Sequence, residues 1–294
     1  MDIRVLKYFL TVAREESITR AAEVLHMTQP PLSRQLKDLK DEVGKQLLIR
    51  GGKRVTLTED GMLLRKRAEE ILDLFEKTKA ELADSDKNIT GEIYIGCGES
   101  DAVSFFAKAA KALQKEHPLI HYRIYSGDAE RVMERLDRGL IDFGLLIGDV
   151  DIEKYDYLKL SISDTWGVLM RKDDPLTEKP EICAEDLWGK PLILSHQAAS
   201  NSKMLSWLKA DEVKPDVVVT GDLIYNVSHF VRNNIGYLIC LDKILNITGE
   251  SDLCFRPLTP KMEAALCIVW KKYQVFSKAS KEFLRRLKAE LSIN

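Results

Sequence analysis

The chain has 294 residues, 45% of them hydrophobic and 31% charged, with a formal net charge of −2. This length is typical of about two domains, and the composition indicates a soluble globular protein and excludes a polycation. No apolar run approaches the roughly 18 residues of a membrane span. Residues 1–17 carry charges throughout and lack a signal-peptide core, so we expect a cytoplasmic protein with no membrane partner.

Positive charge gathers at one end of the chain. Residues 1–67 hold 14 Lys and Arg against nine Asp and Glu, a local excess of five positive charges. A small basic segment on an acidic body is typical of a nucleic-acid-binding module joined to another domain.

The first predicted elements form a helix-turn-helix. Residues 2–15 have apolar side chains at helical spacing, and residues 17–43 predict two helices joined by a tight turn. Ser17 and Thr28 are placed to cap these two helices. Prolines in the first turn of the second helix remove no intrahelical hydrogen bond, because those N–H groups have no partner within the helix.

The second of these helices has two distinct faces. Leu32, Leu36, Leu39 and Val43 form its apolar side. The other side carries long cations, an amide and a hydroxyl, which are the groups that bond phosphate oxygens and base edges. This pattern predicts a recognition helix; the alternative is an ordinary amphipathic helix with a solvated polar face. The polar residues are Gln29, Pro30, Ser33, Arg34, Lys37 and Lys40.

A hairpin is predicted after Gly44, which we expect to stop the recognition helix. Residues 47–57 contain two short apolar runs around Gly51 and Gly52. A hairpin beside a recognition helix is a wing, and its cations are expected to contact phosphates or the minor groove. Those cations are Arg50, Lys53 and Arg54.

A long helix is predicted from a cap at Thr58 to about Leu82. Its apolar positions recur at spacings of four and three, which is typical of a coiled-coil seam and predicts a dimer helix. The alternative is a single helix packed on its own domain. The seam consists of Leu64, Ala68, Ile71, Phe75, Thr78 and Leu82. The polar residues 83–91 that follow predict a hinge.

From Glu92 onward, apolar strands alternate with helices, which predicts a doubly wound α/β body with mostly parallel sheets in two subdomains. The strands are predicted at 93–96, 121–126, 141–148, 166–170, 191–195, 216–220, 235–240 and 265–270. The helices are predicted at about 101–116, 129–138, 201–210, 222–233 and 277–292. The sequence contains no Walker motif, GxGxxG, HExxH or GxSxG, so we expect neither an enzyme nor a cofactor or metal site.

The N-terminal pattern closely resembles the LysR-type transcriptional regulators. The matching positions are Phe9, Val12, Ala13, Ser17, Thr19, Ala21, Ala22, Leu25, Thr28, Gln29, Pro30, Leu32, Ser33, Gln35, Leu36, Leu39, Gly44, Leu47, Arg50, Leu57, Thr58 and Gly61. The resemblance implies an N-terminal all-α winged helix-turn-helix plus a long linker helix, then a C-terminal α/β effector domain of two periplasmic-binding-protein-like lobes. It also implies a homodimer that pairs into a homotetramer and bends promoter DNA, with RNA polymerase as a candidate partner.

The expected domain boundaries follow from this plan. Residues 1–58 form the DNA-binding domain, 59–87 the linker helix and hinge, and 88–294 the effector-binding domain. Its first lobe comprises about 88–162 and 268–294, and its second lobe about 163–267.

The resemblance also assigns the DNA contacts. Arg34 would bond a guanine edge with two hydrogen bonds, Gln29 an adenine edge or a phosphate, and Ser33 a phosphate. The full expected set is Thr28, Gln29, Pro30, Ser33, Arg34, Lys37, Lys53 and Arg54.

The effector site is expected beyond the carboxyl ends of the strands. Members of the resembled family use a hydroxyl residue after the first strand of the body to hold an effector carboxylate, which makes Ser100 the leading candidate. The other candidates are Asp128, Ile147, His196, Ser200, Asn201 and Ser202. Alternatively, Ser100, Asp101, Asn201 and Ser202 are helix caps and His196 is a surface imidazole.

Acidic residues surround this predicted site. Glu99, Asp101 and Asp128 disfavour a highly charged anion, so we expect a small effector, mono-anionic or with an amine, such as a small carboxylate or an amino-acid-like molecule. Ligand binding would close the cleft and change the spacing of the DNA-binding domains.

An alternative within the same fold is a redox sensor that uses cysteines of the body. The cysteines are Cys97, Cys183, Cys240, Cys254 and Cys267, and none is flanked by clustered cations that would lower a thiol pKa. Their odd number and the lack of a CxxC pair favour reduced and mostly buried thiols.

Overall fold

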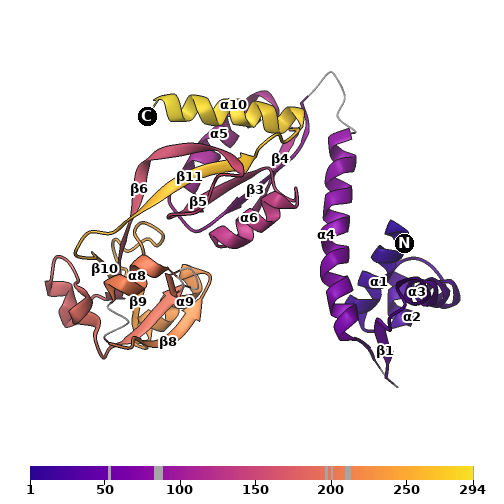
Figure 1. Ribbon diagram of the computed structural model, residues 1–294, viewed down its shortest axis with the longest axis horizontal. Coiled ribbons are helices and arrows are strands. Elements are labelled where there is room, and N and C mark those ends of the chain that lie inside the picture. The colour runs from indigo at the N-terminus through magenta and orange to yellow at the C-terminus, as the bar shows by residue number, and fades with distance from the viewer. Residues whose placement is uncertain (52–53, 83–88, 196–197, 200, 209–212, 294) are drawn as a thin grey trace. The chain divides into compact units, whose positions relative to one another are not determined.

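The computed structural model describes residues 1–51, 54–82, 89–195, 198–199, 201–208 and 213–293. It separates into two units, Met1–Ala83 and Asp84–Asn294 (Figure 1). No helix among these described residues is long and apolar enough to cross a membrane.

The N-terminal unit is a winged helix-turn-helix followed by a long helix. Its elements are α1 (Ile3–Glu15), α2 (Ile18–Val24), α3 (Gln29–Val43), β1 (Leu48–Arg50), β2 (Val55–Leu57) and α4 (Glu59–Leu82). The predicted helices, the hairpin and the end of the long helix are all confirmed. The buried core consists of Phe9, Val12, Ile18, Ala21, Ala22, Leu32, Leu36, Leu39, Leu47 and Val55.

Local hydrogen bonds explain where these helices begin and end. Ser17 accepts a hydrogen bond from the Arg20 N–H at 3.3 Å and caps α2. Thr28 occupies the N-cap position of α3, but its side chain makes no capping hydrogen bond, so the cap predicted there is wrong. Gly44 adopts a φ of 70° and donates its N–H to the Lys40 carbonyl, which ends α3 as predicted.

The apolar face of α3 is shorter than predicted. Leu32, Leu36 and Leu39 are buried, whereas Val43 is 41% exposed. The last turn of α3 therefore extends past the core that holds the first three turns.

The wing forms as an antiparallel pair in which Leu48 faces Leu57 and Arg50 faces Val55. The Val55 N–H donates to the Glu16 carbonyl at 2.9 Å, which ties the wing to the end of α1. The Thr58 hydroxyl accepts from the Gly61 N–H at 3.0 Å and donates to the Gln46 carbonyl at 2.6 Å. This double contact caps α4 and joins it to the loop before the wing.

The predicted seam of α4 divides into two parts. Ala68 is fully buried and Leu64 packs against the core of the N-terminal unit. Ile71, Phe75 and Leu82 are instead exposed, at 38%, 39% and 83%. The proximal part of the seam packs on its own domain, and only the distal part is open to a second chain.

The C-terminal unit alternates strands and helices. Its elements are β3 (Gly91–Cys97), α5 (Val103–Glu116), β4 (Ile120–Ser126), α6 (Ala129–Asp137), β5 (Phe143–Ile147), β6 (Tyr155–Arg171), β7 (Pro191–Ser195), α8 (Ser202–Trp207), β8 (Asp216–Gly221), α9 (Ile224–Arg232), β9 (Tyr237–Leu241), β10 (Leu253–Pro257), β11 (Glu263–Lys271) and α10 (Lys278–Ile293), with short 3₁₀ helices at Pro175–Glu178 and Ala184–Leu187.

The sheet is mixed, so the prediction of mostly parallel sheets is only partly right. The strand order is β4-β3-β5-β11-β6-β9-β7-β8, with β10 also paired to β6. Pairs β3–β4, β3–β5, β7–β8 and β7–β9 are parallel, whereas every pair that involves β6 or β11 is antiparallel. The antiparallel pairs arise because β6 and β11 run in opposite directions between two lobes.

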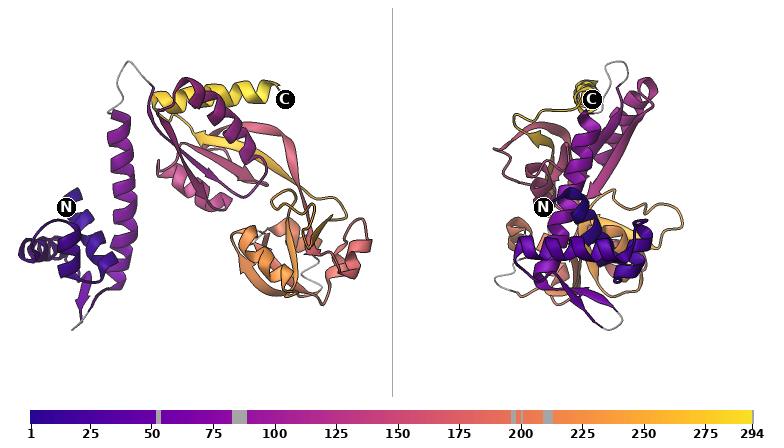
Figure 2. Two further views of the ribbon diagram at one scale, coloured as in Figure 1. Left: turned by 180° about the vertical axis from the view of Figure 1, so that it is seen from behind. Right: turned by 90° about the vertical axis from the view of Figure 1, so that its right-hand side faces the viewer.

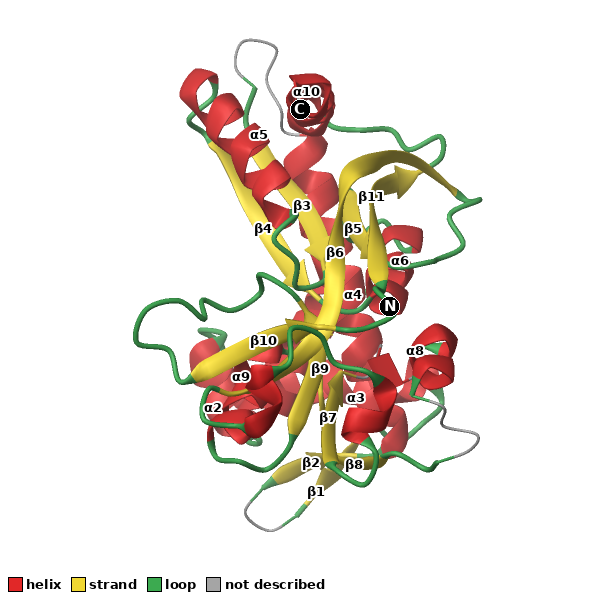
Figure 3. Cartoon of the chain, turned by 90° about the vertical axis from the view of Figure 1, so that its left-hand side faces the viewer, coloured by secondary structure: helices red, strands yellow, loops and turns green. Residues whose placement is uncertain are grey.

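Strands β6 and β11 connect the lobes of this unit (Figure 3). Residues 155–165 of β6 pair with β11 in the first lobe, and residues 166–171 pair with β9 and β10 in the second. The first half of β6 was not predicted, because exposed polar side chains interrupt its apolar residues. The five-residue β10 was also missed.

In the first lobe, helices cover both faces of the sheet. Ile93 and Ile95 of β3 lie in the core beneath α5 and α10, where Phe283 packs between Phe106 and Phe143. Figure 2 shows α10 beside α5 in two further views. Val132 and Leu136 of α6 form a smaller core on the opposite face. In the second lobe, Val227 and Val231 of α9 pack on one face of the sheet, and Met204 of α8 belongs to the core on the other.

Candidate functional site

The recognition helix presents an open polar face. Arg34, Lys37 and Lys40 are exposed, and their side chains form no hydrogen bond or ion pair with any described residue. Gln29 is exposed at the start of α3 and accepts a long hydrogen bond of 3.4 Å from the Thr19 hydroxyl. The apolar side of α3 is packed in the core, and the exposed cations on its other side are available to bind phosphate oxygens and base edges.

The same face continues toward the wing as an open groove. Its lining residues are Phe9, Ser33, Arg34, Leu36, Lys37, Lys40, Gln46, Leu47, Leu48 and Ile49. The predicted contacts Ser33, Arg34 and Lys37 therefore lie on one surface, while Thr28, Gln29 and Pro30 are exposed at the start of the same helix.

Of the three cationic side chains of the wing, the structure describes that of Arg54. The Arg54 guanidinium pairs with Glu16 at 3.2 Å, and both side chains remain largely exposed. An exposed pair of this kind is worth little and can exchange for a phosphate. Lys53 and the side chain of Arg50 lie outside the described residues.

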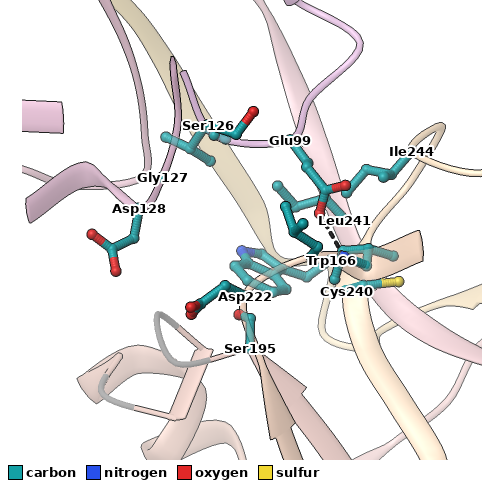
Figure 4. A pocket seen from close by; sticks show the side chains of 14 residues that line it. Glu99, Ser126, Gly127, Asp128, Trp166, Ser195, Asp222, Cys240, Leu241 and Ile244 are labelled. Carbon is teal, nitrogen blue, oxygen red and sulfur yellow. Dashed lines mark hydrogen bonds between the residues drawn. The ribbon is translucent and has the colours of Figure 1, made fainter. Parts of the chain in front are cut away.

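A cavity lies between the two lobes of the C-terminal unit (Figure 4). It has a volume of about 60 Å³, and strand ends from both lobes contribute to it, as the topology predicts. The lining residues are Gly98, Glu99, Ser126, Gly127, Asp128, Ile147, Trp166, Ser195, Asp222, Leu223, Ile224, Cys240, Leu241 and Ile244.

Two of the predicted effector residues, Asp128 and Ile147, line this cavity. Ser100 is not among the lining residues, because its hydroxyl donates to the buried Asp164 carboxylate at 2.5 Å and accepts from the Ala102 N–H. Asn201 caps α8 by accepting from the Met204 N–H at 3.1 Å.

Ser202 is not among the described residues that line the cavity, and it is the exposed first residue of α8. His196 and Ser200 lie outside the described residues.

Glu99 is a cleft residue that sequence reasoning did not select. Its carboxylate accepts a hydrogen bond of 2.5 Å from the Ile224 N–H at the start of α9, so a side chain of the first lobe caps a helix of the second. Burial raises the pKa of this carboxyl, and the hydrogen bond from Ile224 opposes the rise. Its position two residues after the end of β3 was a signal in the sequence, but its partner lies 125 residues away.

Ion pairs also connect the lobes beside the cavity. Arg131 of α6 donates to Asp222 at 3.1 Å, and its Nε lies 3.8 Å from Asp128. Lys203 of α8 pairs with Asp149. Because these links are exposed, they can break and reform when the lobes move.

The redox alternative is not favoured by the cysteines. All five are free thiols, and burial raises the pKa of Cys97, Cys183 and Cys267, and that of Cys240 to about 12. A raised pKa leaves a thiol protonated at neutral pH, whereas a redox sensor needs an accessible thiolate.

A buried carboxyl at the lobe junction gives a stability prediction. Burial raises the pKa of Asp164, while the hydrogen bond from Ser100 opposes the rise. The folded protein therefore holds this proton to higher pH than the unfolded chain, and the ionised form costs stability as pH rises.

We expect Asp164→Asn to raise the free energy of unfolding at pH 8 by on the order of 1 kcal/mol, because the amide can still accept from Ser100 without a charge. The gain should shrink as pH falls through the raised pKa of the folded carboxyl toward the ordinary range of an aspartate, as measured by thermal melting. Asp216→Asn, at an exposed position, is the matched control. A gain that grows as pH falls would contradict the assignment.

A winged helix-turn-helix defines the chain as a DNA-binding protein. The α/β body with a cavity between its two lobes has the architecture of a ligand-binding domain, so the class is that of a DNA-binding regulator. Two family models agree with this class. Residues 3–62 match "Bacterial regulatory helix-turn-helix protein, lysR family", and residues 86–292 match "LysR substrate binding domain". The chain belongs to the LysR family of transcriptional regulators.

Individual proteins extend this result. The chain is 29% identical over 279 residues to the Hca operon transcriptional activator HcaR of Escherichia coli, covering 92% of each chain. It is 39% identical over 143 residues to the regulator BsdA of Bacillus subtilis, covering 48% of this chain and 49% of that protein. These relatives are named as transcriptional regulators and not as enzymes.

Among solved structures, full-length CbnR complexed with its target DNA matches with a TM-score of 0.75 and 18% identity, over 99% of this chain and 100% of that one. Full-length BenM matches with a TM-score of 0.53 and 20% identity, over 100% and 97%. These likenesses confirm the two-part fold predicted from the sequence.

Proposed function

We propose that this regulator binds promoter DNA as a homodimer that pairs into a tetramer, and that a small organic effector in the inter-lobe cavity switches the complex. The observation that carries the proposal is the cavity itself, which both lobes line. Among the described residues, β6 and β11 are the strands that join the two lobes through the sheet. A ligand that contacts both lobes favours one lobe arrangement over another, because it binds the two arrangements with different affinity.

The dimer part of the proposal is supported by α4. Ile71, Leu74, Phe75 and Leu82 leave an exposed apolar stripe along its distal half. A second copy of α4 would bury this stripe and give the two recognition helices the two-fold relation that a palindromic DNA site requires. CbnR is a full-length relative in fold whose structure was solved on its target DNA.

Footprinting of the regulator on DNA upstream of its own gene and its neighbours tests the function. We expect protected half-sites that lie about one or more helical turns apart. An effector added at about 100 times its dissociation constant should add roughly 2.7 kcal/mol of stability and change the footprint. Protection without any half-site spacing would contradict the dimer, and an unchanged footprint would contradict the switch.

The phosphate contacts can be tested separately. We expect Lys37→Ala to weaken DNA binding about equally for specific and random sequences and to lower the slope of log affinity against log salt by about one unit, because one phosphate contact is lost. Lys111→Ala, which removes an exposed charge from α5, serves as the control. Loss of specific binding alone would instead place Lys37 on a base edge.

A further inference from the structure

We propose that the effector is a small organic amine that also carries a neutral hydrogen-bond acceptor, and that Glu99 is the residue that selects it over a carboxylate. This inference rests on the proposed function of the cavity as the effector site. Its basis is how the cavity's own carboxylates, its helix ends and one tryptophan are arranged.

The two helices that begin at the cavity already carry carboxylates at their N-termini. Glu99 accepts from the first N–H of α9 at 2.5 Å, and Asp128 accepts from the Arg131 N–H of α6 at 2.9 Å. An external carboxylate would normally bind at such positions. In this cavity an external carboxylate would have to displace Glu99 or Asp128 from its helix N-terminus, or bind beside that residue and be repelled by its negative charge.

All the charged side chains that line the described part of the cavity are carboxylates. Glu99, Asp128 and Asp222 line it, and its described lining includes no Lys or Arg. Arg131 stands outside the lining and is shared between Asp222 and Asp128. Glu99 has no cationic partner among the described residues, and burial raises the pKa of its carboxyl. An ammonium group at Glu99 would compensate this buried charge with a charge-assisted hydrogen bond.

Trp166 supplies a second, independent requirement. The residue is only 7% exposed, it lines the cavity, and its indole N–H donates to no described residue. Figure 4 shows this nitrogen facing the open space between Ser126 and Asp222. An indole N–H can only donate, so a ligand that displaces the water beside it binds better when it brings an acceptor. Because carboxylates surround this space, a neutral acceptor such as a hydroxyl or a carbonyl fits better than an anion.

The cavity accommodates a small ligand. A volume of about 60 Å³ has room for a few water molecules, and therefore for a molecule of a few heavy atoms. Leu241 and Ile244 supply an apolar wall for its carbon chain. The same wall borders an apolar cavity of about 310 Å³ within the second lobe. The ring face of Trp166 can also attract an ammonium by a cation–π contact.

Isothermal titration of the full-length protein with ethanolamine, glycinamide, propylamine and propionate tests this assignment. We expect ethanolamine and glycinamide to bind more tightly than propylamine, which lacks the acceptor, and propionate to bind least. Glu99→Gln should weaken amine binding at least tenfold. Its amide oxygen still accepts from the Ile224 N–H, so the fold is retained, and thermal melting checks this. Glu250→Gln, which removes an exposed carboxylate of the second lobe, should stay within twofold of the parent.

Trp166→Phe separates the two requirements. It keeps an aromatic face but removes the N–H, so we expect it to bind ethanolamine and propylamine equally. Retained preference for ethanolamine would overturn the role of the indole. Equal amine affinity in Glu99→Gln and its parent, or no binding of any amine, would overturn the assignment of Glu99.

The two proposals fail in different ways. Tight propionate binding that changes the operator footprint would overturn the amine inference and leave the switched regulator intact. If the parent protein protected no operator DNA in the footprinting experiment, the proposed function would be overturned. Amine binding that Glu99→Gln weakens and that changes the footprint would support both.

Discussion

Replacement of Arg34 by alanine is expected to weaken binding to the specific operator by about 1–3 kcal/mol, the value typical of a bidentate contact to guanine. Arg34 is exposed in the middle of the polar face of α3, and Leu32 and Leu36 are buried on either side of it in the sequence. The substitution should therefore remove the expected contact to DNA without disturbing the core. Binding titrations on the operator and on variants of each base pair would measure the loss and show relaxed preference at one position.

Arg34→Lys is the matched variant, because it keeps the charge but cannot form the planar two-bond contact. We expect it to retain binding to random DNA while losing most of the specific affinity. If the Arg34→Lys protein kept the operator affinity of its parent, Arg34 would be a phosphate contact. The direct base readout would then have to come from elsewhere on α3.

Gly61→Ala is expected to destabilise the N-terminal unit by roughly 1–3 kcal/mol or more, the usual cost of overpacking. A Cβ at this position would lie 2.1 Å from the Leu47 carbonyl oxygen and 3.2 Å from the Leu57 side chain. The Leu47 carbonyl cannot yield freely, because it accepts the Thr58 N–H at 3.1 Å. The start of α4 must therefore move away from the wing.

The sign of this effect is diagnostic. In a helix free of tertiary contacts, Gly to Ala stabilises by about 1 kcal/mol, so a loss of stability identifies the close approach to Leu47. Urea unfolding of the full chain, with operator binding as a second measurement, would show both effects. Met62→Ala is the control, because its side chain is 59% exposed on the next residue of α4. A Gly61→Ala protein more stable than its parent would contradict the contact.

Local patterns were sufficient for the N-terminal unit. Helical spacing of apolar residues, two glycines between short apolar runs and the Thr58 cap predicted α1 to α4 and the wing, because each depends on neighbours a few residues apart. The prediction was wrong at Thr28, whose side chain does not cap α3, and at Val43, which the core does not reach. The burial of Val43 and the contacts of the Thr28 side chain both depend on how far the core of the N-terminal unit extends. The spacing of apolar residues in a helix does not specify that extent.

The body was predicted less completely for the same reason. Short apolar strands between helices indicated the α/β class, but the polar half of β6 gave no strand signal. That half forms because β11 pairs with it from Glu263 to Lys271, about a hundred residues later in the chain.

The sequence by itself determined the DNA-binding fold, the two-part plan of the chain and the edge of the sheet where a ligand would bind. These follow from local periodicity, from turn residues and from the rule that strand ends gather at one edge. Only the tertiary structure decided which side chains reach the cavity. It turns Ser100 toward Asp164 and brings Glu99 to the start of α9. Those contacts join residues 64 and 125 positions apart, and a side chain's partner across a cleft is set by how the lobes pack and not by its neighbours in sequence.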